Sequence, residues 1–313
     1  MQSNRRSMTK TILRTLYRSL PFKRPVLSFL RSIGASSLIP NRLKGYLAFT
    51  GPFSIQVEKG SFTMLHGYGR DIESTIFWDG VDVFEPTTIR WWRELSKRST
   101  YIFDIGANTG IYSLVAKTLN PSAEVHAFEP LVRIHKILEE NFRINNLNAP
   151  LFAIKAHRMA LSDYSGMGEM FDLPVEHMYT ASLNRNVHAE RGQPMQSIQE
   201  AVPVMRLDEF LQQQSIHGLD LIKIDVESHE PAVLRGMGEC LSRFHPTMIV
   251  EIWNNEVGVA VEEALAGCDY CYFALATERP ECTPHIRNNF PDEGYINYLV
   301  CTQGMAQELG ILN

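Results

Sequence analysis

Four acidic residues stand at or near the ends of apolar runs in this sequence, and they raise the question of chemistry. They are Asp104, Glu129, Asp225 and Glu251. In an open α/β sheet, ligands bind in the crevice outside the carboxyl ends of the strands. If the apolar runs are strands of one such sheet, the four carboxylates line one edge. A single acid at such a position is more often a helix cap or a structural carboxylate, so the argument depends on the four together.

The loop after Asp104 reads "GANTG", residues 106–110. Gly106 allows a tight turn, Asn108 tolerates unusual backbone angles, and Gly110 lets the next helix begin close to the strand. The spacing differs from the G-x-G-x-x-G dinucleotide fingerprint, and the Asp104 carboxylate would repel a pyrophosphate. Glu129 is placed to accept hydrogen bonds from ribose hydroxyls. The two acids together indicate S-adenosylmethionine, which combines a ribose with an ammonium group and a positive sulfur.

The candidate catalytic residues are concentrated in "KIDVESHE", residues 223–230. The set of titratable groups within six positions is Asp225, Glu227, His229 and Glu230. Since an alcohol is a poor nucleophile at neutral pH, methyl transfer to it needs a base or a metal ion that polarises the oxygen. The spacing does not distinguish a base from a metal, and we expect no metal. The alternative is that Glu230 opens a helix and His229 is solvated.

Strands that alternate with helices must position these residues, and this alternation predicts a parallel, doubly wound sheet. The expected strands are residues 100–106, 123–130, 151–163, 219–227 and 247–253, with 269–275 and 295–301 closing the sheet. The expected helices are residues 86–97, 111–119, 132–146, 207–214 and 230–244. Residues 164–206 interrupt the alternation. Residues 53–84 are expected to be a lead-in of short strands, one of them within "STIFWDGVDVFEP".

Five ordered motifs resemble those of the FkbM-type methyltransferases. They are "FDIGANTGIYSLVA", "AFEP", "ALSD", "LDEFL" and "IKIDVESHEPAVLRGM", spread over roughly residues 75–255. The resemblance implies the class I, Rossmann-like methyltransferase fold: a doubly wound, mostly parallel seven-stranded sheet with one reversed edge strand. It also implies an S-adenosylmethionine-dependent enzyme that methylates a hydroxyl of a sugar, glycolipid or secondary metabolite. Ser228 departs from the family, which more often has glycine there.

The resemblance also implies roles for individual residues. Asp104, Gly106, Asn108 and Gly110 would line the methionine end of the cofactor, and Glu129 would hold the ribose. Ser162 and Asp163, in "ALSD", would lie near the adenine, although an ordinary turn is the alternative. Two other functions stay open at this point: a catalytically silent binding protein of methyltransferase type, and a nucleotide-binding oxidoreductase. The expected partner is a small-molecule or glycan hydroxyl acceptor and not a nucleic acid; the oligomeric state is not predicted.

The charge is unevenly distributed along the 313 residues. Residues 1–50 hold ten basic residues and no acidic one, so they carry +10 and the remainder −15. Apolar residues with helical spacing occur at 12–20 and again at 26–33, but no apolar run approaches the roughly 18–20 residues of a spanning helix. This basic amphipathic arm could pack on the enzyme, contact an anionic membrane peripherally, or serve as a transit peptide. We expect a single methyltransferase domain over residues 51–313, with 51–100 and 164–206 covering the acceptor site.

The composition fits a globular α/β protein with a sizeable core: 44% of residues are hydrophobic and 21% charged. The five cysteines are odd in number and lack a disulfide framework, which favours a reducing, cytoplasmic compartment. Cys268, Cys271, Cys282 and His285 have a spacing compatible with zinc. Residues three apart on an extended strand face opposite ways, however, so structural cysteines are the preferred interpretation.

Overall fold

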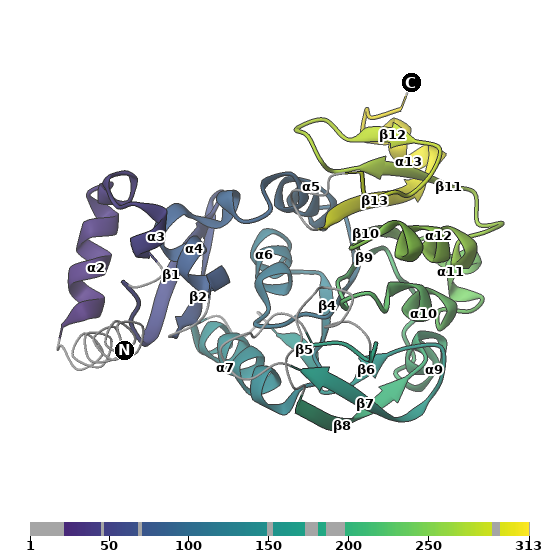
Figure 1. The fold of residues 1–313 in the computed structure, drawn as a ribbon, viewed down its shortest axis with the longest axis horizontal. Coiled ribbons are helices and arrows are strands. Elements are labelled where there is room, and N and C mark those ends of the chain that lie inside the picture. Colours follow the sequence, from purple (N-terminus) through teal and green to yellow (C-terminus); the bar gives the residue numbers. More distant parts are fainter. Residues whose placement is uncertain are drawn as a thin grey trace, which may run out of the picture. The chain divides into compact units, whose positions relative to one another are not determined.

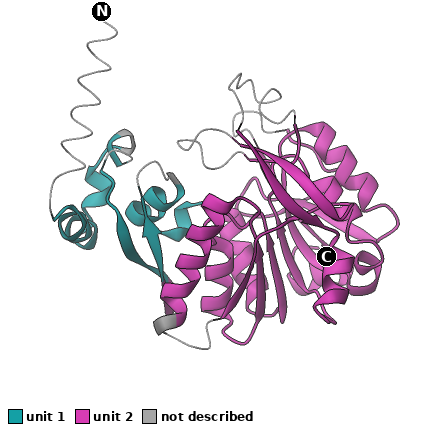
Figure 2. Ribbon diagram, turned by 90° about the horizontal axis from the view of Figure 1, so that it is seen from below, with its two compact units in different colours: residues 1–56, 63–84 teal, residues 57–62, 85–313 magenta. Residues whose placement is uncertain are grey.

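The computed structural model describes residues 22–44, 47–67, 71–148, 153–172, 181–185, 198–289 and 295–312. The chain divides into two compact units (Figure 2), one of residues 1–56 with 63–84 and the other of residues 57–62 with 85–313. The helical pattern expected at residues 12–20 lies outside the described residues. The domain boundaries expected from the sequence stay a prediction.

The smaller unit contains short helices and most of a β-hairpin. Its elements are α2 (Lys23–Ser32), η1 (Ala35–Leu38), α3 (Asn41–Lys44), β1 (Gly51–Val57), β2 (Gly60–His66), α4 (Asp71–Asp79) and η2 (Val81–Val83). Phe49, Phe53, His66 and Phe77 pack their rings together in its core. The short strands expected at the start of residues 53–84 are confirmed as β1 and β2. The strand expected in "STIFWDGVDVFEP" is wrong, since α4 and η2 occupy it; an apolar run this short does not show whether its period is that of a helix or a strand.

Among the described residues, the main sheet of the larger unit has eight strands (Figure 1). Their order is β12 (Glu281–Thr283), β11 (Tyr270–Ala274), β13 (Ile296–Thr302), β10 (Thr247–Ile252), β9 (Leu221–Ile224), β3 (Tyr101–Ile105), β4 (Glu124–Phe128) and β5 (Ile154–His157). The strands from β10 to β5 are parallel, as expected. β13 is antiparallel to both β10 and β11, so the reversed strand lies inside the sheet and not at its edge; β12 adds an eighth strand, antiparallel to β11.

The direction in which the chain adds strands reverses between β3 and β9. From β3 it proceeds through β4 to β5, and from β9 it proceeds the other way to β10. Because parallel crossovers are right-handed, the connecting helices cover opposite faces of the sheet on the two sides of this point. The helices of the unit are α5 (Pro86–Ser96), α6 (Ile111–Leu119), α7 (Val132–Asn148), α9 (Leu207–Gln213), α10 (Glu230–Arg235), α11 (Cys240–Phe244), α12 (Asn255–Ala264) and α13 (Gln303–Glu308). The doubly wound fold class is therefore confirmed.

Two expected elements are each divided in the structure. Residues 151–163 form β5 and, in a separate sheet, β6 (Ala160–Leu161). This second sheet has the order β6, β8 (Ile198–Met205), β7 (Gly166–Asp172) and contains the described part of the expected interruption. The helix expected over 230–244 divides into α10 and α11. A side chain at Gly236, between them, would lie 1.9 Å from the carbonyl oxygen of Ser162, so the chain must turn there without a Cβ.

A histidine pair, with His126 buried and His157 partly exposed, joins β4 to β5. His126 Nδ1 lies 3.0 Å from His157 Nε2, and the His126 Nε2 atom lies 2.9 Å from Glu124 Oε1. Burial lowers the pKa of His126, and burial together with the neighbouring His126 lowers the pKa of His157 to about 4. Both rings are therefore neutral in the folded protein at neutral pH.

This pair should make part of the folding stability depend on pH. Between pH 6.5 and about 4 the unfolded chain binds a proton at His157 and the folded chain does not, so the free energy of unfolding falls as the pH falls. His157→Gln removes this proton site. We expect acidification from pH 7 to 5 to cost the wild type about 1 kcal/mol more than the variant in urea unfolding, after allowance for the partial exposure of the ring. Equal losses would contradict the neutral pair.

Candidate active site

The site lies at the switch point between β3 and β9, where two loops touch through their backbones. The N–H of Asp225 donates to the carbonyl of Ile105 at 3.0 Å. Gly106 has φ +83°, and a Cβ there would lie 1.8 Å from the carbonyl oxygen of Asp225. Only glycine fits, because both the backbone angle and the space exclude a side chain. The loop after β3 and the exit of β9 therefore meet where a ligand is expected.

Asp104, near the end of β3, is buried. Its Oδ2 accepts hydrogen bonds from the backbone N–H of Ser113 at 3.0 Å and from the Ser113 hydroxyl at 2.6 Å. Burial raises the pKa of Asp104 to about 6, against the opposing effect of the Ser113 hydrogen bonds and of Lys223. A cation bound nearby would favour the ionised form. The carboxylate thus fixes the first turns of α6 and adds negative charge behind the glycine loop.

The loop itself leaves an acceptor without a partner. Asn108 has φ +49°, and its buried Oδ1 has no hydrogen-bond partner among the described residues. Gly110 has φ +94°, and a side chain there would meet Leu138 and Phe142 at 2.7 Å. Buried polar atoms are normally hydrogen-bonded, so an unpartnered one in a tight loop suggests a ligand donor. Gly110 lets α6 begin close to α7.

Glu129 follows β4 beside this loop and is also buried. Its Oε1 accepts from the N–H of Leu131 at 2.9 Å. Burial raises the pKa of Glu129 to about 7, while backbone hydrogen bonds from Leu131 and Asn108 lower it. The hydrogen bond from the Asn108 backbone N–H connects the Glu129 carboxylate to the glycine loop. A carboxylate in this position suits a pair of ribose hydroxyls.

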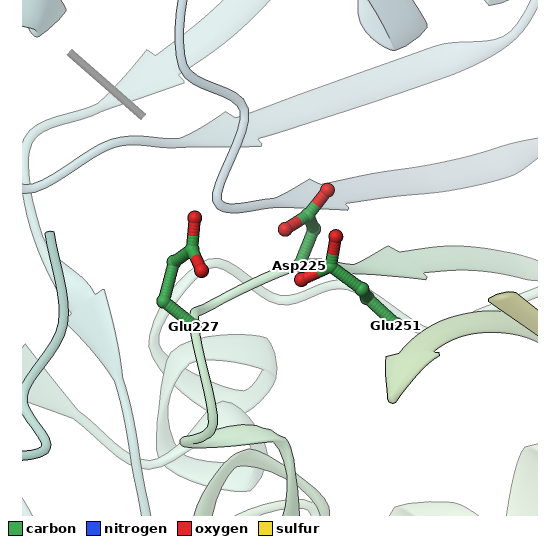
Figure 3. Close-up of side chains that lie close together, drawn as sticks. All are labelled: Asp225, Glu227 and Glu251. Carbon is green, nitrogen blue, oxygen red and sulfur yellow. The ribbon is translucent and has the colours of Figure 1, made fainter. Parts of the chain in front are cut away.

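Three carboxylates converge at the exits of β9 and β10. One oxygen each of Asp225, Glu227 and Glu251 lies within 4.8 Å of the others (Figure 3). Burial and then the charges of Asp225 and Glu227 raise the pKa of Glu251 well above its usual value. The indole N–H of Trp253 donates to Glu251 Oε2 at 2.6 Å. Carboxylates this close repel one another, so the group gains free energy by taking up a proton or a cation.

A buried lysine balances part of this negative charge. Lys223 is fully buried in β9, and its Nζ lies 3.1 Å from Asp225 Oδ2 and 3.2 Å from Asn297 Oδ1. Burial alone would lower the pKa of Lys223, but Asp225, Glu85 and Glu251 together raise it above its usual value. The side chain is therefore ionised. Its ammonium also lies over the ring of Tyr112, 5.2 Å from the centroid.

Glu85 is a further acid in this network, and three side chains donate hydrogen bonds to its carboxylate. Its carboxylate accepts from the hydroxyl of Tyr112 at 2.6 Å, the amide of Asn297 at 3.0 Å and the hydroxyl of Tyr295 at 3.2 Å. Burial raises the pKa of Glu85, whereas Lys223 lowers it. Tyr112 belongs to α6, Asn297 to β13, and Glu85 to the segment before α5. These hydrogen bonds therefore connect three parts of the chain.

The turn after β9 is strained and held by Glu230. Glu227 and Ser228 have φ of +60° and +71°. This is the left-handed region that glycine adopts without strain, which accounts for the glycine that the family more often has at the Ser228 position. Glu230, the first residue of α10, is buried and accepts from the N–H of Val226 at 3.1 Å. Burial raises the pKa of Glu230 to about 7. Glu230 therefore clamps the turn as well as opening a helix.

His229 faces a different part of the site from the three acids. Its Nε2 lies 2.9 Å from the hydroxyl of Ser162, and Ser162 in turn donates to Asp163 at 3.3 Å. Asp163 also pairs with Arg235 at 2.9 Å. Burial lowers the pKa of His229 to about 4, so the ring is neutral. The structure thus joins His229 to the two residues expected near the adenine, and joins Asp225 and Glu227 to Glu251.

Several residues of this network were not predicted from the sequence. Glu251 was noted at a strand end but given no role. Lys223 stands in the apolar run "LIKI", and a charge inside a buried strand was a visible signal, since lysine is almost never fully buried unless paired. Glu85, Tyr295 and Asn297 carried no comparable signal.

All five cysteine thiols are free. Cys271 lies opposite Cys301 in the register of β11 and β13, and His285 Nδ1 lies 3.3 Å from Glu262 Oε2. These contacts place Cys271 within the β-sheet and His285 next to a carboxylate of α12.

The strand order, the glycine loop and the acids at the switch point define a class I methyltransferase fold. A family model described as "Methyltransferase FkbM domain" matches residues 104–296. The chain therefore belongs to the FkbM methyltransferase family, and its methyl donor is S-adenosylmethionine. The family resemblance stated from the motifs is confirmed.

Three curated relatives illustrate the range of the family. "Methyltransferase 1" of Beauveria bassiana is 26% identical, over 59% of this chain and 76% of the relative. "31-O-demethyl-FK506 methyltransferase FkbM" of Streptomyces tacrolimicus is 29% identical, over 44% of this chain and 58% of the relative. "Hexuronic acid methyltransferase AglP" of Haloferax volcanii is 29% identical, over 54% of this chain and 62% of the relative. The chain covers less than two thirds of the length of the last two.

The contact between Gly106 and Asp225 gives a sharp test of the site. Gly106→Ala should lower the free energy of unfolding by about 2 kcal/mol more than Gly267→Ala, because backbone atoms cannot move aside as a flexible side chain can. Gly267 has nearly the same φ, +81°, with nothing within 4 Å of its Cβ position. The control therefore isolates the backbone strain from the clash. Urea unfolding measures the difference, and calorimetric titration with S-adenosylhomocysteine should show lost binding in Gly106→Ala alone. Equal effects of the two substitutions would contradict the contact.

Proposed function

We propose that this chain is an O-methyltransferase that acts on a hydroxyl of a sugar, glycolipid or secondary metabolite. The observation that carries the proposal is the group of three carboxylates beside the glycine loop, because a hydroxyl acceptor must lose a proton to react. The names of two relatives support it, since one specifies an O-demethyl compound and the other a hexuronic acid.

The residues around the loop fit S-adenosylmethionine. We assign the methionine end to Asp104, Gly106, Asn108 and Gly110, the ribose to Glu129, and the adenine side to Ser162 and Asp163. The unpartnered Asn108 oxygen suits a hydrogen-bond donor of a bound ligand, and Gly106 keeps the loop close to the exit of β9. When bound, the cofactor supplies a methyl group on a positively charged sulfur. The acids of the rim complement that charge.

We assign proton removal to the three grouped carboxylates, with Asp225 as the general base. Lys223 keeps Asp225 in place through the 3.1 Å contact, and Glu227 and Glu251 lie beside it. Glu230 positions the turn that carries Glu227. His229, hydrogen-bonded to Ser162, is proposed to act as a positioning residue for the cofactor and not on the acceptor proton.

The acceptor is proposed to bind next to an aromatic pair that adjoins these acids. Trp253 and Tyr295 lie with ring centroids 5.4 Å apart, and each donates a hydrogen bond to an acid of the network, Glu251 and Glu85 respectively. Amphipathic rings with a polar group at one end suit a ligand that is partly apolar and partly hydroxylated. This fits a sugar ring or a hydroxylated metabolite.

Substitution of the base should separate turnover from cofactor binding. We expect Asp225→Asn to lower the turnover number by roughly 10²–10⁴-fold, the usual contribution of general base catalysis. The Kd for S-adenosylhomocysteine should stay within about threefold, since the amide has nearly the shape of the carboxylate. The assay is incorporation of tritiated methyl groups into cell extracts and hexuronic acid-containing glycans.

Glu256→Gln is the matched control, because Glu256 is an exposed acid on α12, outside the group, and its turnover should equal that of the wild type. Unchanged turnover in Asp225→Asn would reject the assignment. Tight cofactor binding by the wild type without methyl incorporation into any acceptor would instead favour the catalytically silent alternative.

Turnover should survive exhaustive chelation with EDTA and 1,10-phenanthroline. Lys223 already places a positive charge against Asp225, so the proton-accepting group has its counter-charge from the protein. The measurement compares turnover before and after chelation, with added Mg²⁺ and Mn²⁺ as the restoration control. A loss that Mg²⁺ or Mn²⁺ restores would show that Asp225, Glu227 and Glu251 act as metal ligands.

A further inference from the structure

Helix α2 presents an apolar stripe to the outside. Phe22, Val26, Phe29 and Ile33 are 77%, 53%, 62% and 60% exposed, and Leu38 in the following turn is 82% exposed. The four positions are spaced by four, three and four residues, so they lie within about 60° of one another around the helix axis. We call these five residues the apolar stripe.

The opposite side of α2 is fixed to its own unit. Leu27 is buried, 4% exposed. The guanidinium of Arg31 donates to the carbonyl of Ser54 at 3.0 Å and lies over the ring of Phe77, 5.2 Å from its centroid. The helix therefore has a covered face and an outward face, and the apolar stripe is the outward one. Single exposed apolar residues are common, but a continuous row of them is typical of an interaction site.

The charge around the apolar stripe indicates the kind of surface that it meets. Lys23 and Arg24 adjoin it in sequence, and residues 22–44 contain five basic residues and no acidic one. Two of the five are held elsewhere, Arg31 on the covered face and Lys44 by Asp79. An apolar row with basic flanks complements an anionic lipid surface, which offers acyl chains beneath negative headgroups. The ten residues of α2 extend only about 15 Å, half the thickness of a bilayer core. No helix in the described part of the chain meets the length and hydropathy needed to cross a membrane.

We propose that the apolar stripe inserts into the surface of an anionic membrane, with α2 parallel to the surface and Lys23 and Arg24 at the headgroups. The sequence left three alternatives for the basic arm: packing on the enzyme, peripheral contact with a membrane, and a transit peptide. This proposal is the second of them and assigns the contact to the five residues of the apolar stripe. It does not depend on the identity of the methyl acceptor.

The test is flotation of the full chain with lipid vesicles. The wild type should bind vesicles of phosphatidylcholine with about one third phosphatidylserine, and bind pure phosphatidylcholine far more weakly. Phe29→Ser with Ile33→Ser should lower the partition coefficient at least tenfold, because two large side chains no longer enter the acyl region. Lys23→Gln with Arg24→Gln should weaken binding and reduce its dependence on salt.

Met167→Ser with Ile198→Ser is the matched control, since these residues are 66% and 50% exposed in the other unit, and it should bind like the wild type. Absence of wild-type binding would overturn the proposal, as would equal binding by the stripe variant.

Light scattering and thermal unfolding test whether a second copy of the chain, or another part of the same chain, covers the apolar stripe instead of a membrane. A wild-type dimer that the stripe variant converts to a monomer would mean that a second copy covers the stripe. A clear drop in Tm for the stripe variant would mean that the chain itself covers it, and either result overturns the proposal.

Discussion

The contact between the buried ammonium of Lys223 and the acids around it is the interaction on which the proposed active site depends. An unpaired charge in a protein interior is very costly, and a group of unpaired carboxylates is equally so. Here Asp225, Glu85 and Glu251 raise the pKa of Lys223. Burial raises the pKa values of Glu85 and Glu251, and Lys223 opposes that rise. The cation thereby allows several acids to converge at the switch point. Acidic side chains at this place suit a positively charged methyl donor and, in the function proposed above, a hydroxyl that gives up a proton.

Sequence patterns were sufficient to predict the edge of the sheet to which we assign the cofactor. Apolar runs that end in Asp104, Glu129 and Asp225 predict buried parallel strands, and the topology of such a sheet brings their carboxyl ends to one side. The patterns could not show that Glu85 and Asn297, 212 positions apart, would share a hydrogen bond. A contact between residues so far apart in sequence depends on the tertiary structure. The local spacing of apolar and polar residues does not contain this information.

Local geometry also decided which neighbours in sequence act together. Four candidate residues lie within "DVESHE", yet two consecutive left-handed residues turn His229 toward Ser162 and leave Glu227 beside Asp225 and Glu251. In helix α2 the spacing predicted an amphipathic helix, but it did not show which apolar residues would be covered. The structure buries Leu27 and exposes Phe29. In both cases the sequence restricted the residues to a small set, and tertiary packing selected among them.

The central claim is that the carboxylates at the β3–β9 switch point hold the methyl donor with its sulfur facing Asp225 and Glu251. A crystal structure of the chain with S-adenosylhomocysteine tests it most directly. The account predicts ribose hydroxyls on Glu129, the amino acid end against Asp104 and the glycine loop, and the sulfur on the side of the three acids. A ligand bound away from this edge, or one whose sulfur points away from Asp225, would contradict the account.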